Sequence, residues 1–456
     1  MKYIVLALMS FGVVISRGWL QHDRRRLQYV GFLIGFSPFF LGLLHINMAL
    51  ISWAGWPGYV KGIEVSIVDF LVLATFLSLP RSRHPLPFVF PMAAYFAAAL
   101  LSVLQSGVPM ASLFYCWQLL RMFFLYRVLS SASEDRQFAE AVLKGLGAAV
   151  IVQAFVAGGQ HFALRVAEAH GTTGSKNELG MMTDLVVIPA FALLLSGRPG
   201  RFNGAVVLSA LIVAVSTGSR AAIGLGGLGY AATFALSLLR QWTPRKAAML
   251  LAAAVVAIVV GFAAYISLSH RTAAQFAGSD AERAVFEHAA AMILGDHPLG
   301  VGANEYVVVV NIDQYNTRAG VPWDVNNSGA IVHNIYWLMA AETGYFGLVT
   351  YVVLLASCLV YVFRRARRYR NDRRGDLLMG IAVSFSILYV HGLFEWVSVV
   401  SPVQYVYCIL LAVAVGISNQ LAREERMKKD SARLSARSAP VARAHVVGAL
   451  CGFRSP

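Results

Sequence analysis

The chain has 456 residues, of which 58% are hydrophobic and only 13% are charged. A soluble domain carries about 25% charged residues, and the mean hydropathy here is +0.63, so the composition excludes a soluble enzyme. Runs such as residues 248–268 are apolar on every face, which excludes a transmembrane β-barrel, because its strands alternate polar and apolar residues. We therefore expect an all-α integral membrane protein.

Apolar segments along the chain predict about 12–13 transmembrane helices, since roughly 20 mostly apolar residues cross a bilayer as a helix. The segments are residues 3–16, 28–50, 63–80, 87–106, 109–129, 139–158, 179–196, 203–217, 221–239, 247–268, 335–362, 377–398 and 403–420. The first has no small-residue cleavage site after it, so we interpret it as a retained helix, with a signal peptide as the alternative.

The net charge of +15 is a signal of topology in such a protein, because lysine and arginine accumulate in cytoplasmic loops. Alternating the spans from a cytoplasmic segment at residues 17–26 places most of the 38 basic residues inside. The amino terminus is then outside and the carboxyl terminus inside. Residues 1–268 hold ten spans, residues 269–334 form one large external loop, periplasmic in a Gram-negative host, and residues 335–420 hold three more spans.

The tail, residues 421–456, is basic and has no apolar period, so we expect a disordered cytoplasmic strip on the anionic inner leaflet. No aromatic residues interleave its charges as stacking platforms, which disfavours nucleic-acid binding. The four cysteines show no disulfide or zinc-site spacing and are interpreted as packing residues.

The external loop is expected to contain an amphipathic helix at residues 280–294, followed by a turn at residues 296–300. Val285, Ala289 and Met292 would face the membrane, and Arg283 and Glu287 would pair one turn apart. This loop is where chemistry is expected.

Cations on the external side are candidates for binding phosphate, since a guanidinium offers a planar fork of donors. Arg220 closes the stretch STGSRAAIGL in a tight outer turn, and Lys61, Arg165, Lys176 and Arg283 lie on the same side. The alternative for Arg220 is a snorkelling anchor, and the others are equally compatible with solvated charges.

His333 and Asn334 stand at the start of the span after the external loop. A neutral imidazole is the side chain best matched to general-base work near neutral pH. The alternative is an interfacial histidine hydrogen-bonded to a loop carbonyl. Within the spans, Glu342, Asp69, Glu64 and Glu395 are carboxylates that need partners, and Arg121 is one candidate partner.

The order of these parts resembles the O-antigen ligase and O-antigen polymerase superfamily of bacterial envelope glycosyltransferases. Four segments carry the resemblance: GTTGSKNELG at 171–180, Ser216 to Arg220, Arg283 through DHPLGVGANEY at 296–306, and HN at 333–334 followed by ETGYFGL. The resemblance covers about residues 171–362 well. It implies a helical fold like that of the type C glycosyltransferases, in the bacterial inner membrane, with the active site facing the periplasm.

The resemblance implies glycan transfer from a polyprenyl-pyrophosphate-linked donor to a hydroxyl group of an acceptor sugar. Arg220 and Arg283 would bind the pyrophosphate and His333 would act as general base, with Asn334, Glu342, Lys61 and Arg121 as supporting residues. No cofactor is expected, and no metal, because no Asp-x-Asp pair lies on the outer side. Expected partners are the lipid-linked donor, the glycan acceptor, membrane lipids, a flippase and a chain-length regulator.

Within that superfamily, Gly62 to Ala74 resembles exopolysaccharide polymerases more than ligases. The favoured function is therefore polymerisation of lipid-linked repeat units. The alternatives are a ligase that transfers the glycan to lipid A core and attachment of glycan to protein. A transporter is disfavoured because the chain shows no repeated halves.

Overall fold

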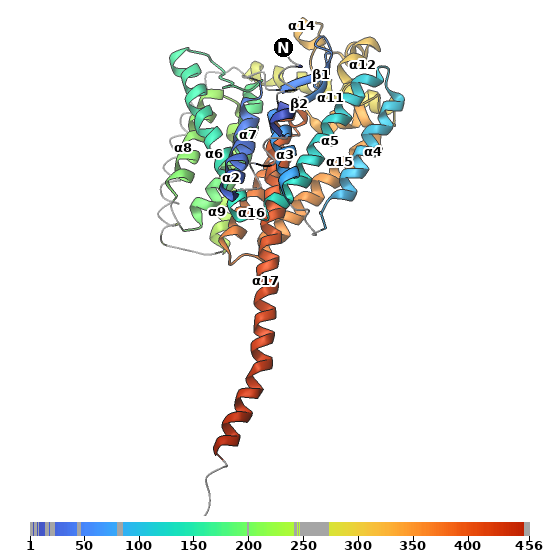
Figure 1. Cartoon of the computed structure of the whole chain (residues 1–456). Helices are drawn as coiled ribbons and strands as arrows, with labels where there is room; N and C mark the ends of the chain where they lie inside the picture. Colours follow the sequence, from blue (N-terminus) through green and yellow to red (C-terminus); the bar gives the residue numbers. More distant parts are fainter. Residues whose placement is uncertain are drawn as a thin grey trace, which may run out of the picture.

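The computed structural model describes residues 23–42, 47–79, 85–197, 200–240 and 273–450, with isolated positions before residue 23 and at 244 and 246. The predicted span at 247–268 lies outside these residues, and the first span is described only in part. Figure 1 shows a bundle of helices from which one long helix projects.

The bundle confirms an all-α integral membrane protein. Its helices are α2 (Arg24–Phe36), α3 (Ile67–Ser78), α4 (Val89–Ser102), α5 (Pro109–Ala132), α6 (Arg136–Gly158), α7 (Lys176–Leu195), α8 (Arg201–Thr217), α9 (Arg220–Arg240), α15 (Ile335–Arg368), α16 (Arg373–His391) and α17 (Ser401–Leu450). Among the described residues, five helices are long and apolar enough to cross a membrane: α6 with its π-helical end, α7, α9, α15 and α17. The predicted total of about 12–13 therefore includes shorter apolar helices such as α3 and α8.

Helix α17 lies at the centre of the bundle (Figure 1). It packs against α5, α6, α7 and α16, and residues from Val403 to Ile417 on it are buried by these neighbours. The outer helices α8 and α9 pack against α7 instead and leave apolar side chains such as Leu208 and Leu228 exposed, as expected for surfaces that face lipid.

A β-hairpin replaces parts of two predicted spans. Strand β1 (Asn47–Ser52) pairs antiparallel with β2 (Gly62–Ser66), directly before α3. The predicted span at residues 28–50 therefore ends as a helix at Phe40, where the 3₁₀-helix after α2 ends. The prediction was wrong there because a hydropathy window does not distinguish a short apolar strand from a helix.

The predicted large loop is mostly helical. It consists of α11 (Ala273–Asp296), α12 (Tyr306–Ile312), α13 (Tyr315–Ala319) and α14 (Val325–Ser328). These helices and the hairpin gather at one end of the bundle, which we call the loop end (Figure 1). The amphipathic helix is present but buries Phe286, Ala289, Ala290 and Ile293, packing against α15 and α13 instead of facing the membrane.

Helix α15 is broken near its start. Gly344 has non-helical torsion angles (φ 68°, ψ −172°), and the break frees the carbonyl groups of Ala341 and Glu342. Both carbonyls accept hydrogen bonds from the loop backbone. The amide of Val301 donates to Ala341 O at 3.1 Å, and the amide of Gly302 donates to Glu342 O at 3.0 Å. The first turns of α15, which follow His333 and Asn334, thus belong to the loop end.

The tail differs from the predicted disordered strip, because α17 continues as one helix to Leu450. Alanine, arginine, lysine and glutamate favour helix at these positions. Ion pairs tie the helix to the bundle: Arg374 to Glu424 at 2.6 Å and Arg368 to Glu425 at 2.9 Å.

Candidate functional site

His333 pairs with Glu395 across the loop end. The His333 Nδ1 atom lies 3.3 Å from Glu395 Oε2, although 62 residues separate the two in sequence. The imidazole is 38% exposed, whereas the carboxylate is 5% exposed. The imidazole therefore faces the surface and the carboxylate supports it from the protein interior.

Glu395 also accepts a hydrogen bond from the start of α7. Asn177 Nδ2 donates to Glu395 Oε1 at 2.6 Å, and the other atom of the same amide, Oδ1, accepts from Ser219 Oγ at 2.9 Å. Ser219 immediately precedes Arg220, the first residue of α9. Three hydrogen bonds thus join His333 to the residue before Arg220.

Local sequence explains how these residues reach one another. Ser175 caps α7 by accepting from the amide of Glu178 at 3.1 Å, which holds Asn177 in the first turn of the helix. Gly218 ends α8 in the left-handed conformation (φ 59°) that glycine adopts most easily. The chain then reverses within one residue, so Ser219 lies at the loop end.

Asn334 joins α15 to the loop helix α11. Its Oδ1 accepts from the amides of Tyr336 and Trp337, which caps α15, and its Nδ2 donates to Glu287 Oε1 at 3.0 Å. The predicted pair of Arg283 and Glu287 does not form, and Glu287 accepts from Asn334 instead. Half-buried Arg283, one turn before Glu287, has no ion pair with any residue that the structure describes.

Glu342 holds the hairpin and the glycine loop together. Its carboxylate is fully buried and accepts from Tyr59 Oη at 2.5 Å and from the amide of Tyr306 at 3.2 Å. Burial, and after it the Glu342 carboxylate, raises the pKa of Tyr59, so the phenol stays a neutral donor. Lys61, two residues away, is exposed on the hairpin.

Arg121 belongs to a separate buried cluster. Its Nε lies 3.1 Å from Asp69 Oδ2, its Nη1 donates to the carbonyl of Glu64 at 2.7 Å, and its Nη2 donates to Tyr405 Oη. Asp69 is thus the carboxylate that Arg121 partners, and none of these contacts links Arg121 to the His333 pair.

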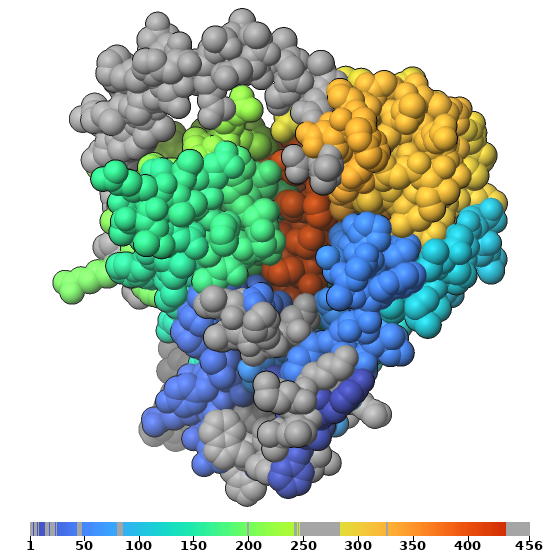
Figure 2. Space-filling model, turned by 90° about the horizontal axis from the view of Figure 1, so that it is seen from above, coloured from blue at the N-terminus to red at the C-terminus, as the bar shows by residue number. Residues whose placement is uncertain are grey.

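The surface of the loop end is hollowed between two groups of segments (Figure 2). Figure 2 shows a cleft between the green surface of the α6–α7 region and the yellow-to-orange surface of the loop helices. The floor of the cleft has the colour of residues near 400, and Glu395 leads directly into this segment.

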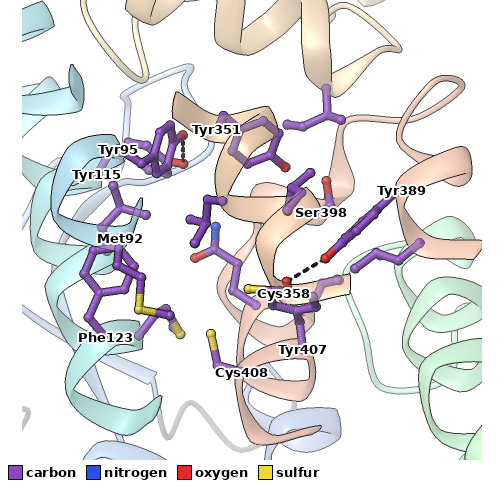
Figure 3. Close-up of a pocket in the computed structure, with 18 of the residues that line it drawn as sticks. Met92, Tyr95, Tyr115, Phe123, Tyr351, Cys358, Tyr389, Ser398, Tyr407 and Cys408 are labelled. Atoms are coloured by element: carbon purple, nitrogen blue, oxygen red, sulfur yellow. Dashed lines mark hydrogen bonds between the residues drawn. The ribbon is translucent and has the colours of Figure 1, made fainter. Parts of the chain in front are cut away.

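An apolar cavity lies beneath the start of α15. It is lined by side chains of α4, α5, α15, α16 and α17, including Ile335 and Tyr336, which follow His333 and Asn334. Figure 3 shows two pairs of tyrosine hydroxyls in its wall: Tyr95 with Tyr115, and Tyr389 with Tyr407, each 2.8 Å apart. Because these four hydroxyls pair with one another and most of the other lining side chains are aliphatic or aromatic, the wall suits hydrocarbon better than phosphate or sugar.

Among the described residues, no group of three or more histidine, cysteine, aspartate and glutamate side chains is arranged to hold a metal ion. The polar groups of the site are instead arranged as donors and acceptors for one another.

Part of the chain matches a known protein family. Residues 204–352 match the family described as O-antigen ligase, a segment that includes Arg220, Arg283 and His333. No curated protein matches the chain.

The sequence predicted His333, Arg220 and Arg283 as site residues. It did not assign a role in the site to Glu395, Asn177 or Ser219. The signals were present, since Glu395 was a carboxylate in a predicted span without a partner, and the other two lie in the quoted segments 171–180 and 216–220.

Proposed function

Since the chain belongs to the O-antigen ligase and polymerase superfamily, whose members are glycosyltransferase-like enzymes, we propose that it transfers a glycan from a polyprenyl pyrophosphate to a sugar hydroxyl. The observation that carries this proposal is the His333–Glu395 pair, because three hydrogen bonds join His333 to the residue before Arg220. In this proposal, His333 as proton acceptor and Arg220 as phosphate-binding cation act in the same reaction.

In the proposed step, the acceptor hydroxyl oxygen forms a bond to the anomeric carbon of the donor sugar. The bond from that carbon to the phosphate oxygen breaks, and the pyrophosphate leaves with the electron pair. His333 Nε2 accepts the hydroxyl proton. Arg220 and Arg283 stabilise the charge that grows on the phosphate oxygens, which lowers the transition state more than the ground state.

The apolar cavity beneath Tyr336 supports a lipid-linked donor. Its lining is mostly hydrocarbon and aromatic, so it can receive part of the polyprenyl chain while the pyrophosphate stays at the polar loop end. The step needs neither a nucleotide sugar nor a metal ion, and the reaction would take place on the periplasmic face of the inner membrane.

Polymerisation is the form of the reaction that we favour, because Gly62 to Ala74 resembles exopolysaccharide polymerases. The ligase reaction is the second candidate, because the matching family is described as O-antigen ligase. A flippase and a chain-length regulator would be partners of the polymerase.

Purified protein tests both reactions in one assay. It is incubated with a lipid-linked oligosaccharide, with and without a lipid A core acceptor. Longer lipid-linked glycans together with free polyprenyl pyrophosphate indicate polymerase, and glycan on the core lipid indicates ligase. If neither product forms with donors of several repeat structures, while the protein moves glycan lipids across vesicles, the protein is a transporter.

A further inference from the structure

We infer that Glu395 is a positioning residue for His333, and that Asn177 and Ser219 extend this support to the start of the helix that carries Arg220. The inference rests on the proposed function, because it assigns a role to residues around the same base. It adds three residues from three separate segments of the chain.

The burial of Glu395 requires strong hydrogen-bond donors. A carboxylate taken out of water is costly unless its oxygens are hydrogen-bonded, and its side chain is only 5% exposed. Among the described residues, the two donors are Asn177 Nδ2 on one oxygen and His333 Nδ1 on the other. Each oxygen therefore has one partner, and the carboxylate is held between α7 and the start of α15.

This arrangement selects the tautomer of His333. An ionised carboxylate only accepts hydrogen bonds, so the proton of the neutral imidazole must be on Nδ1. The lone pair is then on Nε2, at the free edge of the 38% exposed ring. A hydrogen bond at one ring nitrogen commonly sets the role of the other in this way.

The orientation of Asn177 follows from its two partners. Its amide carbonyl accepts from Ser219 Oγ at 2.9 Å, so its NH₂ group faces Glu395. A reversed amide would place a carbonyl oxygen against a carboxylate oxygen, with no proton between them. The hydroxyl, the amide and the imidazole thus all donate in the direction of the buried charge.

The hydrogen-bonded residues His333, Glu395, Asn177 and Ser219, which we call the relay, connect the proposed base to the helix that begins with Arg220. Ser219 is 3% exposed and lies directly before Arg220, so a displacement of Asn177 changes the support at the start of α9. The geometry couples two parts of the proposed step, proton removal and charge stabilisation, through one buried carboxylate.

Several charged groups on the elements around Glu395 have other partners. Lys176 on α7 pairs with Glu168 at 2.5 Å, and Glu287 on α11 accepts from Asn334. Glu178 accepts from the amide of Gly174 at 3.1 Å. The other charged or titratable groups described on these elements include Arg283 and His288 on α11, Arg220 on α9, and fully buried His391 at the end of α16, which interacts electrostatically with Glu395.

The test compares kcat, KM and the pH profile of Glu395→Gln, Glu395→Asp and His333→Ala in the transfer assay. Replacing a carboxylate that orients a general-base imidazole with an amide can cost up to about ten-thousandfold in kcat, so Glu395→Gln should lose at least about tenfold in kcat with KM for the lipid-linked donor within about threefold. Glu395→Asp keeps the charge and should recover part of kcat.

Double variants test the extension to α9. If the relay acts as one unit, Ser219→Ala should lower kcat alone but add little in the Glu395→Gln background. Ser216→Ala is the matched control, because Ser216 is buried three residues earlier and its hydroxyl has no hydrogen-bond partner among the residues that the structure describes. It should keep activity within about twofold.

The outcomes separate this inference from the proposed function. Wild-type kcat in Glu395→Gln, with His333→Ala inactive, would overturn the positioning role alone. Normal activity in His333→Ala would overturn the base itself. A lower protein yield with unchanged kcat and pH profile per folded molecule would reduce Glu395 to a structural residue and also overturn the inference.

Discussion

The backbones of Gly300 and Gly344 cross in direct contact at the loop end. A Cβ atom on Gly300 would lie 2.6 Å from the nitrogen of Gly344, and one on Gly344 would lie 2.3 Å from the carbonyl oxygen of Pro298. Both glycines have positive φ angles, 84° and 68°. This crossing fixes the glycine loop against the broken start of α15, and so against His333 and Asn334.

Replacing Gly344 with alanine should disrupt the loop end. With φ 68° and ψ −172°, Gly344 lies in a region that glycine alone adopts readily, which costs a residue with a Cβ atom about 1–3 kcal/mol, and contact with backbone atoms forces the loop to move. We expect less folded protein and a lower melting temperature in detergent. Gly329→Ala is the control, because a Cβ atom at Gly329 meets nothing within 4 Å. Equal stability of both variants would show that the crossing is not required.

Arg220→Lys should lose much of the activity although it keeps the charge, because lysine offers a point charge instead of a planar fork. Loss of such a contact to the developing phosphate charge is worth about 2–4 kcal/mol, or roughly thirty-fold to several hundred-fold in rate. The same result is expected for Arg283→Lys. Turnover is measured at matched protein levels.

The control for the arginine variants is Arg318→Ala. Arg318 forms a half-exposed ion pair with Asp296 at 3.4 Å, and pairs of this kind contribute little. Normal turnover in both Arg220→Lys and Arg220→Ala would remove Arg220 from the site.

His333→Ala should be nearly inactive yet folded, since a positioned general base contributes about a hundred-fold to ten-thousand-fold. Wild-type activity should fall in acid, where a protonated imidazole cannot accept a proton. The residual activity of the variant should not show this decrease. Exposed His288 on α11 provides the control, as His288→Ala. Retention of most activity across pH in His333→Gln would instead indicate a residue that only orients the loop.

Arg121 is expected to act on stability and not on turnover. Removing one partner of a buried ion pair costs about 3–5 kcal/mol, because the other charge is left uncompensated. Arg121→Met or Asp69→Leu alone should therefore reduce the yield of folded protein, and the double variant should recover part of it. Loss of turnover in a well-folded Arg121→Met would return Arg121 to the site.

The topology can be checked with reporter fusions. Fusions after Gly278 and Asn326 should report an external location, and those after Arg201, Arg370 and Arg433 a cytoplasmic one. This follows from the distribution of basic residues. A cytoplasmic signal at Gly278 would contradict both the topology and a periplasmic site.

Much of the fold could be predicted because hydropathy and helix periodicity are local signals. The predicted spans at 109–129 and 139–158 correspond to α5 and α6. The hairpin was missed because Asn47–Ser52 is short and apolar, and only its pairing with Gly62–Ser66 makes it a strand.

The candidate site was predicted only as separate pieces. A resemblance to a family identified His333, but nothing local indicates that Glu395, 62 residues later, turns back to it. Similarly, Glu287 was expected to pair within its own helix, one turn from Arg283, whereas Asn334 from α15 takes that carboxylate. Contacts between distant segments depend on how the helices pack, which a single sequence does not display.

The central position of α17 has a consequence for biosynthesis. The ribosome makes α17 after α5, α6, α7 and α16, the helices that surround it, so these must wait in the bilayer with their inner faces uncovered. Until Tyr405 arrives, Asp69 and Arg121 have to neutralise each other without its hydroxyl, which bonds both in the finished bundle. Assembly of the bundle is thus delayed until late in translation, and nascent chains that stop before Ser401 would be substrates for membrane quality control.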